Sequence, residues 1–468
     1  MHSSASDLGP LRPVSYSELM ATLRSSFAAG FTRDHGWRHS QLHRLETLLG
    51  ENQSVLVDAL RADLGKCASE AWLSDLGLTV SSIRFARKNL RKWIGPRSVR
   101  TPITLFPAHS QIIREPVGVV LVIGAWNYPV QLALMPLVAA VAAGNCVVVK
   151  PSEISAATSA ALARLIPQYL DTNSIAVVTG GAQETAALLK QNFDHIFYTG
   201  GASVGRLVMQ AAAQHLTPVT LELGGKSPCI VDETANVEIA ARRIAFGKFL
   251  NAGQTCIAPD YVLVLEARRE ELLAALKRAI VEFYGENPRS SPDYARIVND
   301  RHFDRVCRLL AGNQIVVGGE TDRESRFIAP TILRQVDPGS PIMTEEVFGP
   351  VLPVLDVSTL TEAIDFVNAR PKPLALYLFT ASSRSERTVL RRTISGGVCI
   401  NATLLHHANE RLPFGGVGDS GFGYYHGRFG FETFTHPRAV VRKPARPDIR
   451  LGYPPYTKLK DFLLRWIL

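Results

Sequence analysis

The chain has 468 residues and a mass of 51.2 kDa, which predicts about three domains or sub-domains at roughly 150 residues each. Hydrophobic residues make up 46% and charged residues 20%, a globular composition that excludes collagen-like, mucin-like and largely disordered chains. The net charge of +9 comes from two short basic stretches, 84–100 and 438–468, and the rest of the chain is slightly acidic, so we do not expect nucleic-acid binding.

The first residues are polar and carry no apolar signal segment, which predicts a cytoplasmic protein. The six cysteines contain no C-x-x-C pair, so neither a disulfide framework nor a zinc site is expected, and a reducing compartment suits them. Residues 14–95 show helical spacing of leucines and end at Gly95-Pro96. Residues 97–115 alternate polar and apolar side chains, which predicts an exposed hairpin.

Residues 116–149 contain no charged side chain and are long enough to cross a membrane. Prolines, Asn127 and the Gly144-Asn145 pair interrupt this run. These breaks favour a buried strand over 117–124, a helix over 129–143 and a second buried strand over 146–150. We therefore expect a soluble α/β segment rather than a transmembrane span.

Between 117 and 223, short apolar runs alternate with Ala-rich helical stretches. This alternation is typical of βαβ units and a parallel sheet, which binds nucleotides at the carboxyl ends of its strands. A second α/β stretch follows over about 225–424, and the tail after 437 is basic and rich in proline.

Three polar residues are candidates for chemistry. Cys256 follows Gly253-Gln-Thr, so it is either a nucleophile on a tight turn or an inert buried thiol. Glu222 ends an apolar strand before two glycines, where burial favours a general base, and the alternative is an ion pair with Lys226. Asn127 carries an amide that is either satisfied internally or donates to a reacting oxygen.

Two further segments suit a dinucleotide. Lys150 and Glu153 directly follow a strand, where they can bind ribose hydroxyls. The loop over 200–205 joins a strand to a helix and suits a pyrophosphate through Gly200, Gly201, Ser203 and Gly205. It is not a Walker loop, because Arg206-Leu207 stands where Lys-Ser/Thr is required.

Two other patterns carry little weight. A G-x-G-x-x-G spacing at Gly416, Gly418 and Gly421 lies outside the βαβ region, so we do not interpret it as a nucleotide site. The pair His406-His407 lacks the partners of a known metal motif, so no metal is expected.

Together these segments resemble the aldehyde dehydrogenase superfamily, and most closely its class 3 branch of fatty and aromatic aldehyde dehydrogenases. They occur in family order from Gly124 to Gly427, about two-thirds of the chain. The sequence after Cys256 and the Tyr-His-Gly near the end point to class 3. The matching segments are GAWNYP, KPSE, FYTGGASVG, LELGGK, GKFLNAGQTCIAPDY, EEVFGP and LPFGGVGDSGFGYYHG.

The resemblance implies the α/β aldehyde dehydrogenase fold. Its Rossmann-like parallel-sheet cofactor domain corresponds to 1–223, with an oligomerisation hairpin at 97–115. An α/β catalytic domain corresponds to 224–424, and 425–468 to a small oligomerisation element with the basic tail. It also implies a homodimer joined through the hairpin and the strand-like segment 439–442.

The resemblance assigns roles to residues. Cys256 matches the nucleophile, Glu222 the general base, and Asn127, with the backbone amide of Cys256, the oxyanion hole. Lys150 and Glu153 match ribose contacts and the loop over 200–205 the pyrophosphate site. The nicotinamide end is matched by Glu346 and Phe348, and the substrate pocket by Tyr128, Thr255, Leu404 and His407.

The implied function is NAD(P)-dependent oxidation of an aromatic or medium- to long-chain aldehyde to the carboxylic acid, through a thiohemiacetal and a thioester on the cysteine. Glu153 favours NAD, because its charge repels a 2′-phosphate, although class 3 enzymes often accept both cofactors. Acyl transfer to coenzyme A is an alternative that Glu222 disfavours, and a non-catalytic role is another.

Three departures from the family pattern, Asp419, His407 and Glu410, concern the substrate rather than the chemistry. The segment 456–468 mixes apolar and charged side chains, follows basic residues and is predicted to be amphipathic. It could lie on a membrane surface, or it could pack on the protein or on a partner subunit.

Overall fold

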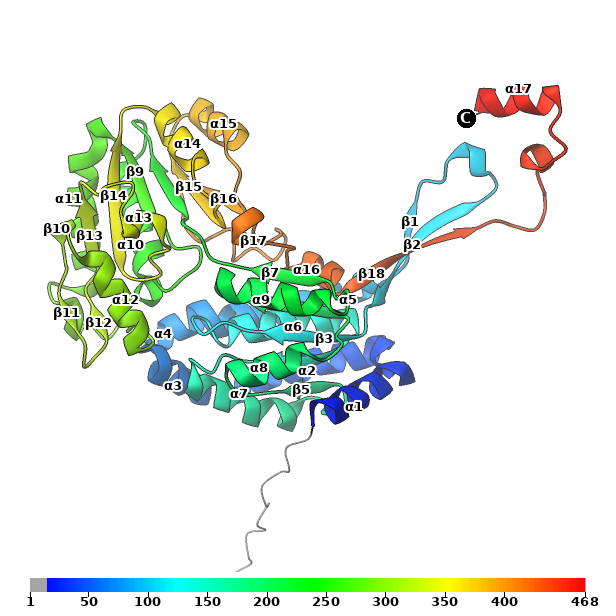
Figure 1. Cartoon of the computed structure of the whole chain (residues 1–468), viewed down its shortest axis with the longest axis horizontal. Coiled ribbons are helices and arrows are strands. Elements are labelled where there is room, and N and C mark those ends of the chain that lie inside the picture. Colours follow the sequence, from blue (N-terminus) through cyan, green and yellow to red (C-terminus); the bar gives the residue numbers. More distant parts are fainter. Residues whose placement is uncertain (1–14, 468) are drawn as a thin grey trace, which may run out of the picture.

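The computed structural model describes residues 15–467, and the expectation about a signal segment falls on residues outside this range. The chain forms two α/β bodies and a projecting arm (Figure 1). The α/β fold class predicted from the sequence is confirmed by this topology and by solved structures of the same fold. The predicted residue boundaries of the three domains stay a prediction.

The first body is built on a six-stranded sheet in the order β17-β7-β6-β3-β4-β5, in which β3 to β7 are parallel and β17 is antiparallel. The order reverses between β3 and β6, which creates the crevice where such sheets bind ligands. The strands are β3 (Val119–Ile123), β4 (Cys146–Lys150), β5 (Ile175–Val177), β6 (His195–Thr199), β7 (Val219–Glu222) and β17 (Gly421–Phe422).

Helices cover both faces of this sheet, so its central strands are buried throughout. Alternate residues of β3 face opposite layers: Val120 and Val122 pack in one core cluster, whereas Val119 and Leu121 pack in the other. The helices are α1 (Tyr16–Ala29), α2 (His35–Glu51), α3 (Gln53–Leu64), α4 (Ala68–Ala71), α5 (Gly77–Ile94), α6 (Gln131–Ala143), α7 (Ala156–Tyr169), α8 (Ala182–Leu189), α9 (Ala202–Ala213) and α16 (Gly427–Thr433).

The uncharged run over 116–149 folds as β3, α6 and β4, as the sequence predicted. All residues of α6 are buried, because this helix lies between the sheet and an outer layer that includes α2 and α5. Within residues 15–467, no helix combines the length and the apolar character that crossing a bilayer requires.

The second body is built on a seven-stranded sheet in the order β10-β13-β14-β9-β8-β15-β16, parallel except for β10. Its strands are β8 (Pro228–Val231), β9 (Tyr261–Leu265), β10 (Gln314–Val317), β13 (Thr331–Arg334), β14 (Val351–Val357), β15 (Ala375–Phe379) and β16 (Gly397–Ile400). Its helices are α10 (Val237–Phe249), α11 (Arg269–Tyr284), α12 (Asp300–Leu310), α13 (Pro341–Thr344), α14 (Leu360–Asn368) and α15 (Ser383–Arg392), beside the small hairpin of β11 (Thr321–Asp322) and β12 (Phe327–Ile328).

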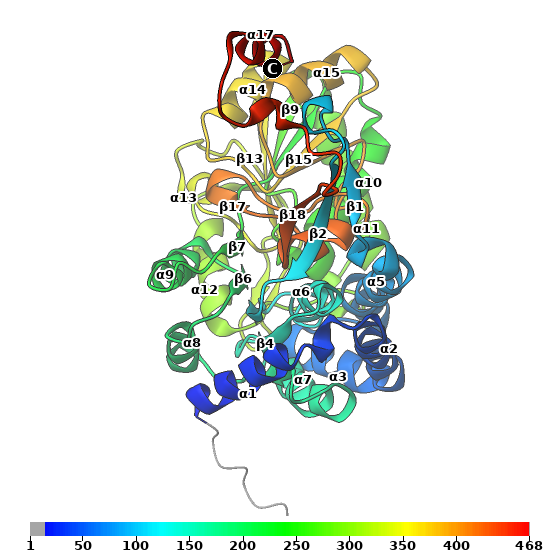
Figure 2. The ribbon, with the colours of Figure 1, turned by 90° about the vertical axis from the view of Figure 1, so that its right-hand side faces the viewer.

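The arm is a three-stranded antiparallel sheet of β1 (Arg97–Val99), β2 (His109–Pro116) and β18 (Thr435–Arg442). It extends from the first body and ends in helix α17 (Lys458–Ile467), as Figures 1 and 2 both show. The hairpin predicted over 97–115 is therefore present. It pairs with a strand more than 300 residues later in the chain, so the two distant segments form one element.

Candidate active site

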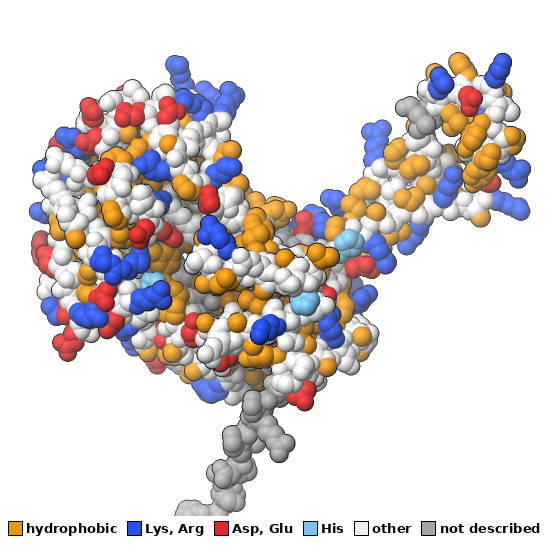
Figure 3. All heavy atoms as spheres, in the orientation of Figure 1, with side chains coloured by type: hydrophobic (Ala, Val, Ile, Leu, Met, Phe, Trp, Pro, Cys, Tyr) orange, Lys and Arg blue, Asp and Glu red, His pale blue; other side chains and the backbone are white. Residues whose placement is uncertain are grey.

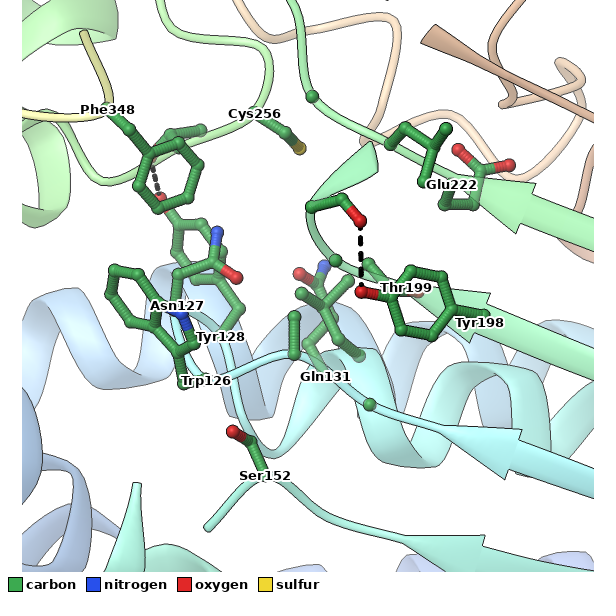
Figure 4. A pocket seen from close by; sticks show the side chains of 18 of the residues that line it. Trp126, Asn127, Tyr128, Gln131, Ser152, Tyr198, Thr199, Glu222, Cys256 and Phe348 are labelled. Atoms are coloured by element: carbon green, nitrogen blue, oxygen red, sulfur yellow. Dashed lines mark hydrogen bonds between the residues drawn. The ribbon is translucent and has the colours of Figure 1, made fainter. Parts of the chain in front are cut away.

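A large cavity of about 1030 Å³ lies where loops of the two bodies meet. The first body contributes the carboxyl ends of β3, β4, β6 and β7, and the second contributes the loops that precede β9 and β14. This is the edge of a parallel sheet at which ligands bind. All the residues that the sequence singled out for catalysis line this one cavity, namely Cys256, Glu222 and Asn127 (Figure 4).

Cys256 reaches the cavity through a left-handed turn. Helix α10 ends at Phe249, and Asn251, Ala252 and Gly253 follow with φ of 55°, 50° and 74°. A Cβ on Gly253 would lie 2.2 Å from the carbonyl oxygen of Gly349, so this position requires glycine. The turn that the Gly-Gln-Thr pattern predicted is therefore present, and it directs Cys256 into the cavity rather than into a core.

The thiol of Cys256 rests in its protonated form. Burial, together with the negative charges of Glu346 and Glu222, raises the pKa of Cys256 to about 12. Only the thiolate is strongly nucleophilic, so the reaction of Cys256 requires the loss of its proton.

Glu222 is the last residue of β7 and is 3% exposed. Neither of its carboxyl oxygens has a hydrogen-bond partner among the described residues, and burial raises its pKa well above the usual range. The alternative ion pair with Lys226 is not formed, because the ammonium of Lys226 pairs with Asp260 and donates to the carbonyls of Ile342 and Glu345. Glu222 is therefore a carboxyl group that is free to exchange a proton.

Asn127 follows β3 and is 3% exposed. Its Nδ2 donates to the carbonyl oxygen of Gln254 at 3.0 Å. A side-chain amide has two N–H donors, so one remains for another acceptor. Figure 4 shows Asn127 and Cys256 directed toward the same part of the cavity, with Glu222 on the other side of Cys256 in this view.

Lys150 and Glu153 form an ion pair at the end of β4, with Nζ and Oε2 2.7 Å apart. Burial acts to raise the pKa of Glu153, but hydrogen bonds and the charge of Lys150 outweigh it and lower that pKa. Glu153 is therefore a carboxylate, and its half-exposed side chain lines the cavity where it can accept hydrogen bonds from hydroxyl groups.

The loop over 200–205 leads from β6 into α9, which begins at Ala202. Among the residues that the structure describes, no side chain caps this end of α9, so its first backbone N–H groups face the cavity without such a partner. A Cβ on Gly200 would lie 2.3 Å from the hydroxyl oxygen of Tyr198, which explains the glycine. Free amides at the start of a helix suit an anion such as a pyrophosphate, and Gly200, Gly201 and Ser203 all line the cavity, whereas Gly205 is buried in the first turn of α9 behind them.

Glu346 and Phe348 enter the cavity from the loop before β14. Burial and the charge of Asp260 raise the pKa of Glu346 to about 8. The ring of Phe348 packs edge-on against Trp126, with centroids 5.3 Å apart. Both residues line the same cavity as Cys256, and Figure 4 shows Phe348 beside Trp126.

The four residues expected near a substrate, Tyr128, Thr255, Leu404 and His407, all line the cavity. The hydroxyl groups of Tyr128 and Thr255 are hydrogen-bonded to each other. His407 Nε2 lies 2.8 Å from Nε2 of Gln131, and burial, with a smaller effect of His406, lowers the pKa of His407 to about 3. The imidazole of His407 is therefore neutral at physiological pH.

Two of the departures lie away from the cavity. Asp419 is exposed on the 3₁₀ turn Gly418–Ser420, and Glu410 accepts a hydrogen bond from the backbone N–H of Gly427 at 2.9 Å. Neither lines the cavity, so only His407 among the three is placed to contact a substrate. Of the glycines in the G-x-G-x-x-G spacing, Gly418 begins this 3₁₀ turn, Gly421 begins β17 and Gly416 precedes both, so none of them begins an α-helix.

The sequence did not single out Gln131 or Trp126, which also line the cavity. Gln131 is a polar residue inside the uncharged, mostly apolar run over 116–149. Its polarity there could have marked it as a candidate site residue. Within residues 15–467, no group of three or more His, Cys, Asp or Glu side chains is placed to hold a metal ion.

Comparison with known proteins finds close relatives. A model described as the aldehyde dehydrogenase family matches residues 20–440. The chain is 48% identical over 445 residues to aldehyde dehydrogenase family 3 member B1 of Rattus norvegicus, covering 95% of each chain. It is also 48% identical over 427 residues to 4,4'-diaponeurosporen-aldehyde dehydrogenase of Staphylococcus aureus, covering 91% of this chain and 93% of that one.

Solved structures agree with these matches. The substrate-bound state of Staphylococcus aureus AldH superimposes with a TM-score of 0.95 at 45% identity, covering 97% of this chain and 100% of that one. Indole-3-acetaldehyde dehydrogenase in complex with NAD+ superimposes with a TM-score of 0.83 at 28% identity, covering 92% and 88%.

Proposed function

The chain belongs to the aldehyde dehydrogenase family, and we propose that Cys256, Asn127 and Glu222 carry out its reaction, the NAD(P)-dependent oxidation of an aldehyde to a carboxylic acid. The observation that carries this assignment is the placement of a thiol, an amide donor and an unpartnered carboxyl group in the wall of one cavity at the carboxyl ends of a parallel sheet.

The first step is the attack of the Cys256 thiolate, formed when the thiol gives up its proton to solvent, on the aldehyde carbon. The new C–S bond converts the carbonyl oxygen into an oxyanion, which needs hydrogen-bond donors. The second N–H of Asn127 and the backbone N–H of Cys256 are the two donors that we assign to it. Because Asn127 is held by its other N–H, it donates without reorganising as charge develops.

The residues around the cavity fit a nicotinamide dinucleotide. The free amides at the start of α9 suit its pyrophosphate, and Lys150 with Glu153 suits a ribose. We assign Glu346 and Phe348 to its nicotinamide end, next to Cys256. When bound, the nicotinamide ring supplies the hydride acceptor that the oxidation requires.

Glu222 then serves the hydrolysis of the thioester left on Cys256. Its unpartnered oxygens can take a proton from a water molecule as the water oxygen attacks the thioester carbon. The C–S bond breaks, the carboxylic acid leaves, and the proton that Glu222 took from the water passes to the sulfur, which restores the Cys256 thiol. A carboxyl group whose pKa is raised by burial is a stronger base than a solvated one, which suits it to this task.

The test of this assignment is an assay of the purified protein with a panel of aldehydes and either NAD or NADP, read as absorbance at 340 nm. We expect Cys256→Ala to abolish the signal. Cys307→Ala, a half-buried thiol on α12 outside the cavity wall, is the matched control and should keep full activity. Activity that survives in Cys256→Ala would contradict the assignment.

We propose an aromatic or medium- to long-chain aliphatic aldehyde as the substrate and NAD as the preferred cofactor. Apolar side chains, including Leu404, Leu405 and Phe414, line much of the cavity, which supports an apolar substrate. The ionised Glu153 supports NAD, because a 2′-phosphate at the ribose would meet its negative charge. Values of kcat/KM across the aldehyde panel with both cofactors test both parts.

We also propose a homodimer joined through the arm. The sheet order β1-β2-β18 leaves the outer edge of β18 without a strand partner among residues 15–467. An exposed strand edge tends to pair with another chain, and a second copy is the partner that closes a symmetric interface. Light scattering coupled to gel filtration should give twice the chain mass of 51.2 kDa. A monomeric mass would contradict the proposal.

Helix α17 at the tip of the arm supports contact with a membrane surface. Leu459, Phe462 and Trp466 share one face and are 68%, 67% and 79% exposed, and Lys and Arg side chains lie along the arm (Figure 3). The alternative is that this face packs on a partner subunit. Co-sedimentation with anionic liposomes should deplete the full chain from the supernatant but not a chain of residues 1–443. Equal soluble fractions would favour packing of α17 on a partner subunit.

The free cysteines support a cytoplasmic location, because a reducing compartment keeps thiols from forming disulfides.

A further inference from the structure

Behind the cavity wall, the short segment 66–75 carries three charged side chains that are almost fully buried. Lys66 and Asp75 are 0% exposed and Glu70 is 8% exposed. The segment includes α4 and all but the last residue of a π-helical turn, Trp72–Leu76. Burying charge is costly unless every charge is paired and hydrogen-bonded, so the partners of these groups show what the segment holds in place.

Lys66 contacts Asn127 and Tyr128 in the loop that follows β3. Its ammonium nitrogen lies 2.7 Å from Asp75 Oδ2 and donates to the backbone carbonyl of Asn127 at 3.1 Å. It also lies 4.0 Å from the centroid of the Tyr128 ring, a cation–π contact. One buried cation therefore fixes both the main chain of Asn127 and the ring of Tyr128, whose hydroxyl is bonded to Thr255, the neighbour of Cys256.

Asp75 holds the residues on the other side of Asn127. Its Oδ1 accepts hydrogen bonds from the backbone N–H groups of Val130 and Gln131, at 3.2 and 3.3 Å. These amides lie at the start of α6, where a helix lacks partners for its first N–H groups. Lys66 and Asp75 are paired with each other, and their hydrogen bonds hold the loop from Asn127 to Gln131 at both ends.

Glu70 holds the turn that precedes Cys256, and this turn is itself bonded to the loop of Asn127. Its Oε1 accepts from the backbone N–H of Asn251 at 2.8 Å. The side-chain amide of Asn251 in turn donates to the carbonyl oxygens of Asn127, at 2.9 Å, and of Gln254, at 3.2 Å. The carbonyl of Gln254 is also the acceptor that holds the Asn127 amide. The two loops that present Asn127 and Cys256 are therefore joined through buried hydrogen bonds.

We propose that Lys66 and Asp75 are positioning residues for the oxidation step, which hold the Asn127 amide where it donates to the oxyanion. This inference rests on the proposed role of Asn127. An oxyanion donor acts only from about 2.7–3.1 Å of the developing charge, and a misplacement of about 1 Å can cost on the order of 10²-fold in rate. A buried ion pair is seldom a source of net stability, whereas it does fix the geometry of the groups that it contacts.

The double variant Lys66→Met with Asp75→Leu tests the proposal, because it removes both charges and leaves neither one unpaired. Replacing a buried ion pair by apolar side chains is often neutral for stability, so the variant is expected to fold. We expect kcat to fall about tenfold, with KM for the aldehyde and Kd for NAD changed by less than about twofold, since only the oxyanion donor is displaced.

A double-mutant cycle with Asn127→Ala separates positioning from general support of the fold. When the amide is already absent, displacing its loop should cost less than about threefold more, because coupled residues are not additive. The same tenfold loss in both backgrounds would overturn the proposal, as would an unchanged kcat in the folded double variant. If Asn127→Ala alone leaves kcat intact, the assigned role of Asn127 is wrong. That outcome contradicts the proposed function and is distinguishable from a failure of the positioning proposal.

Two further variants keep the test decisive. Leu45→Ala removes a buried side chain of α2 that does not line the cavity, and it should lower the melting temperature without changing kcat. If the double variant does not fold, Asp75→Asn retains an acceptor for the amides of Val130 and Gln131 while removing the charge beside Lys66. We expect it to lose kcat in the wild-type background and little more in Asn127→Ala, and equal losses would overturn the proposal.

Discussion

The two sides of Cys256 differ in how their polar groups are satisfied. On the side of Asn127, one N–H of the amide, the main-chain carbonyl and the neighbouring backbone N–H groups have hydrogen-bond partners, several of them from buried charged residues. On the side of Glu222, both carboxyl oxygens lack a partner among the described residues. An oxyanion donor has to be held still, whereas a base has to exchange protons with water, and the two environments match these opposite requirements.

The strongest way to break this contrast is to remove the acid–base capacity of Glu222 while keeping its shape. We expect Glu222→Gln to lower steady-state kcat by about 10²–10⁴-fold, because an amide cannot take the proton of the attacking water. The steps before hydrolysis do not need this group, so one equivalent of reduced cofactor per site should still form rapidly. Rapid-mixing absorbance at 340 nm measures this burst, and mass spectrometry should find the acyl group on Cys256. A variant without a burst would contradict the role.

A change on the side of Asn127 should slow an earlier step, the formation of the acyl-enzyme. We expect Asn127→Ala to lower the rate of the burst itself by about 10²–10³-fold, because the oxyanion loses one of its two donors. No acyl-enzyme should accumulate, since its formation becomes rate-limiting. Single-turnover measurements beside Glu222→Gln make the comparison direct, and a normal burst in Asn127→Ala would show that its amide does not serve the oxyanion.

Cys256 lies between the two sides, and its titration sharpens the comparison. With a pKa raised to about 12, its thiolate fraction in the cofactor-free protein rises with pH throughout the neutral and alkaline range. We expect the rate of alkylation by iodoacetamide to increase about tenfold per pH unit between pH 7 and pH 10. Mass spectrometry of the peptide that contains Cys256 follows this rate, and a plateau near pH 8 would show that the burial is relieved in solution.

The smallest effect is expected at the ion pair of Lys150 and Glu153, where Glu153 is 47% exposed. Solvent screens this carboxylate, so its repulsion of a 2′-phosphate is modest. Glu153→Gln should raise kcat/KM for NADP several-fold and leave kcat with NAD within about twofold. Kinetics with both cofactors check this, and an unchanged ratio of NADP to NAD would remove Glu153 as a determinant.

The site residues that could be predicted from the sequence are those that short contiguous motifs mark. Cys256 stands after a Gly-Gln-Thr turn, Glu222 ends a strand before two glycines, and Asn127 interrupts an uncharged run. The succession of strands and helices was likewise predictable, because burial on both faces makes parallel strands continuously apolar. Gln131 followed the same logic as Asn127 and could have been found.

The ion pair beneath Asn127 could not be predicted in this way. Lys66 lies between α3 and α4 and Asp75 in the π-helical turn, some 50 to 60 residues before the loop that they hold, and no local pattern distinguishes them from solvated charges. Similarly, Lys226 pairs with Asp260 and not with Glu222, which is only four residues away in the sequence. The fold brings the loop that carries Lys226 beside the residue that precedes β9.

The sequence by itself determined the fold class, the three groups that we assign to catalysis and the edge of the sheet to which we assign the cofactor, because each depends on periodicity or on a short motif. The tertiary structure alone decided which charges are paired and which carboxyl group stays unpartnered. Those outcomes depend on distances between segments far apart in the chain, and burial then sets both the cost of every unpaired charge and the direction of each pKa shift.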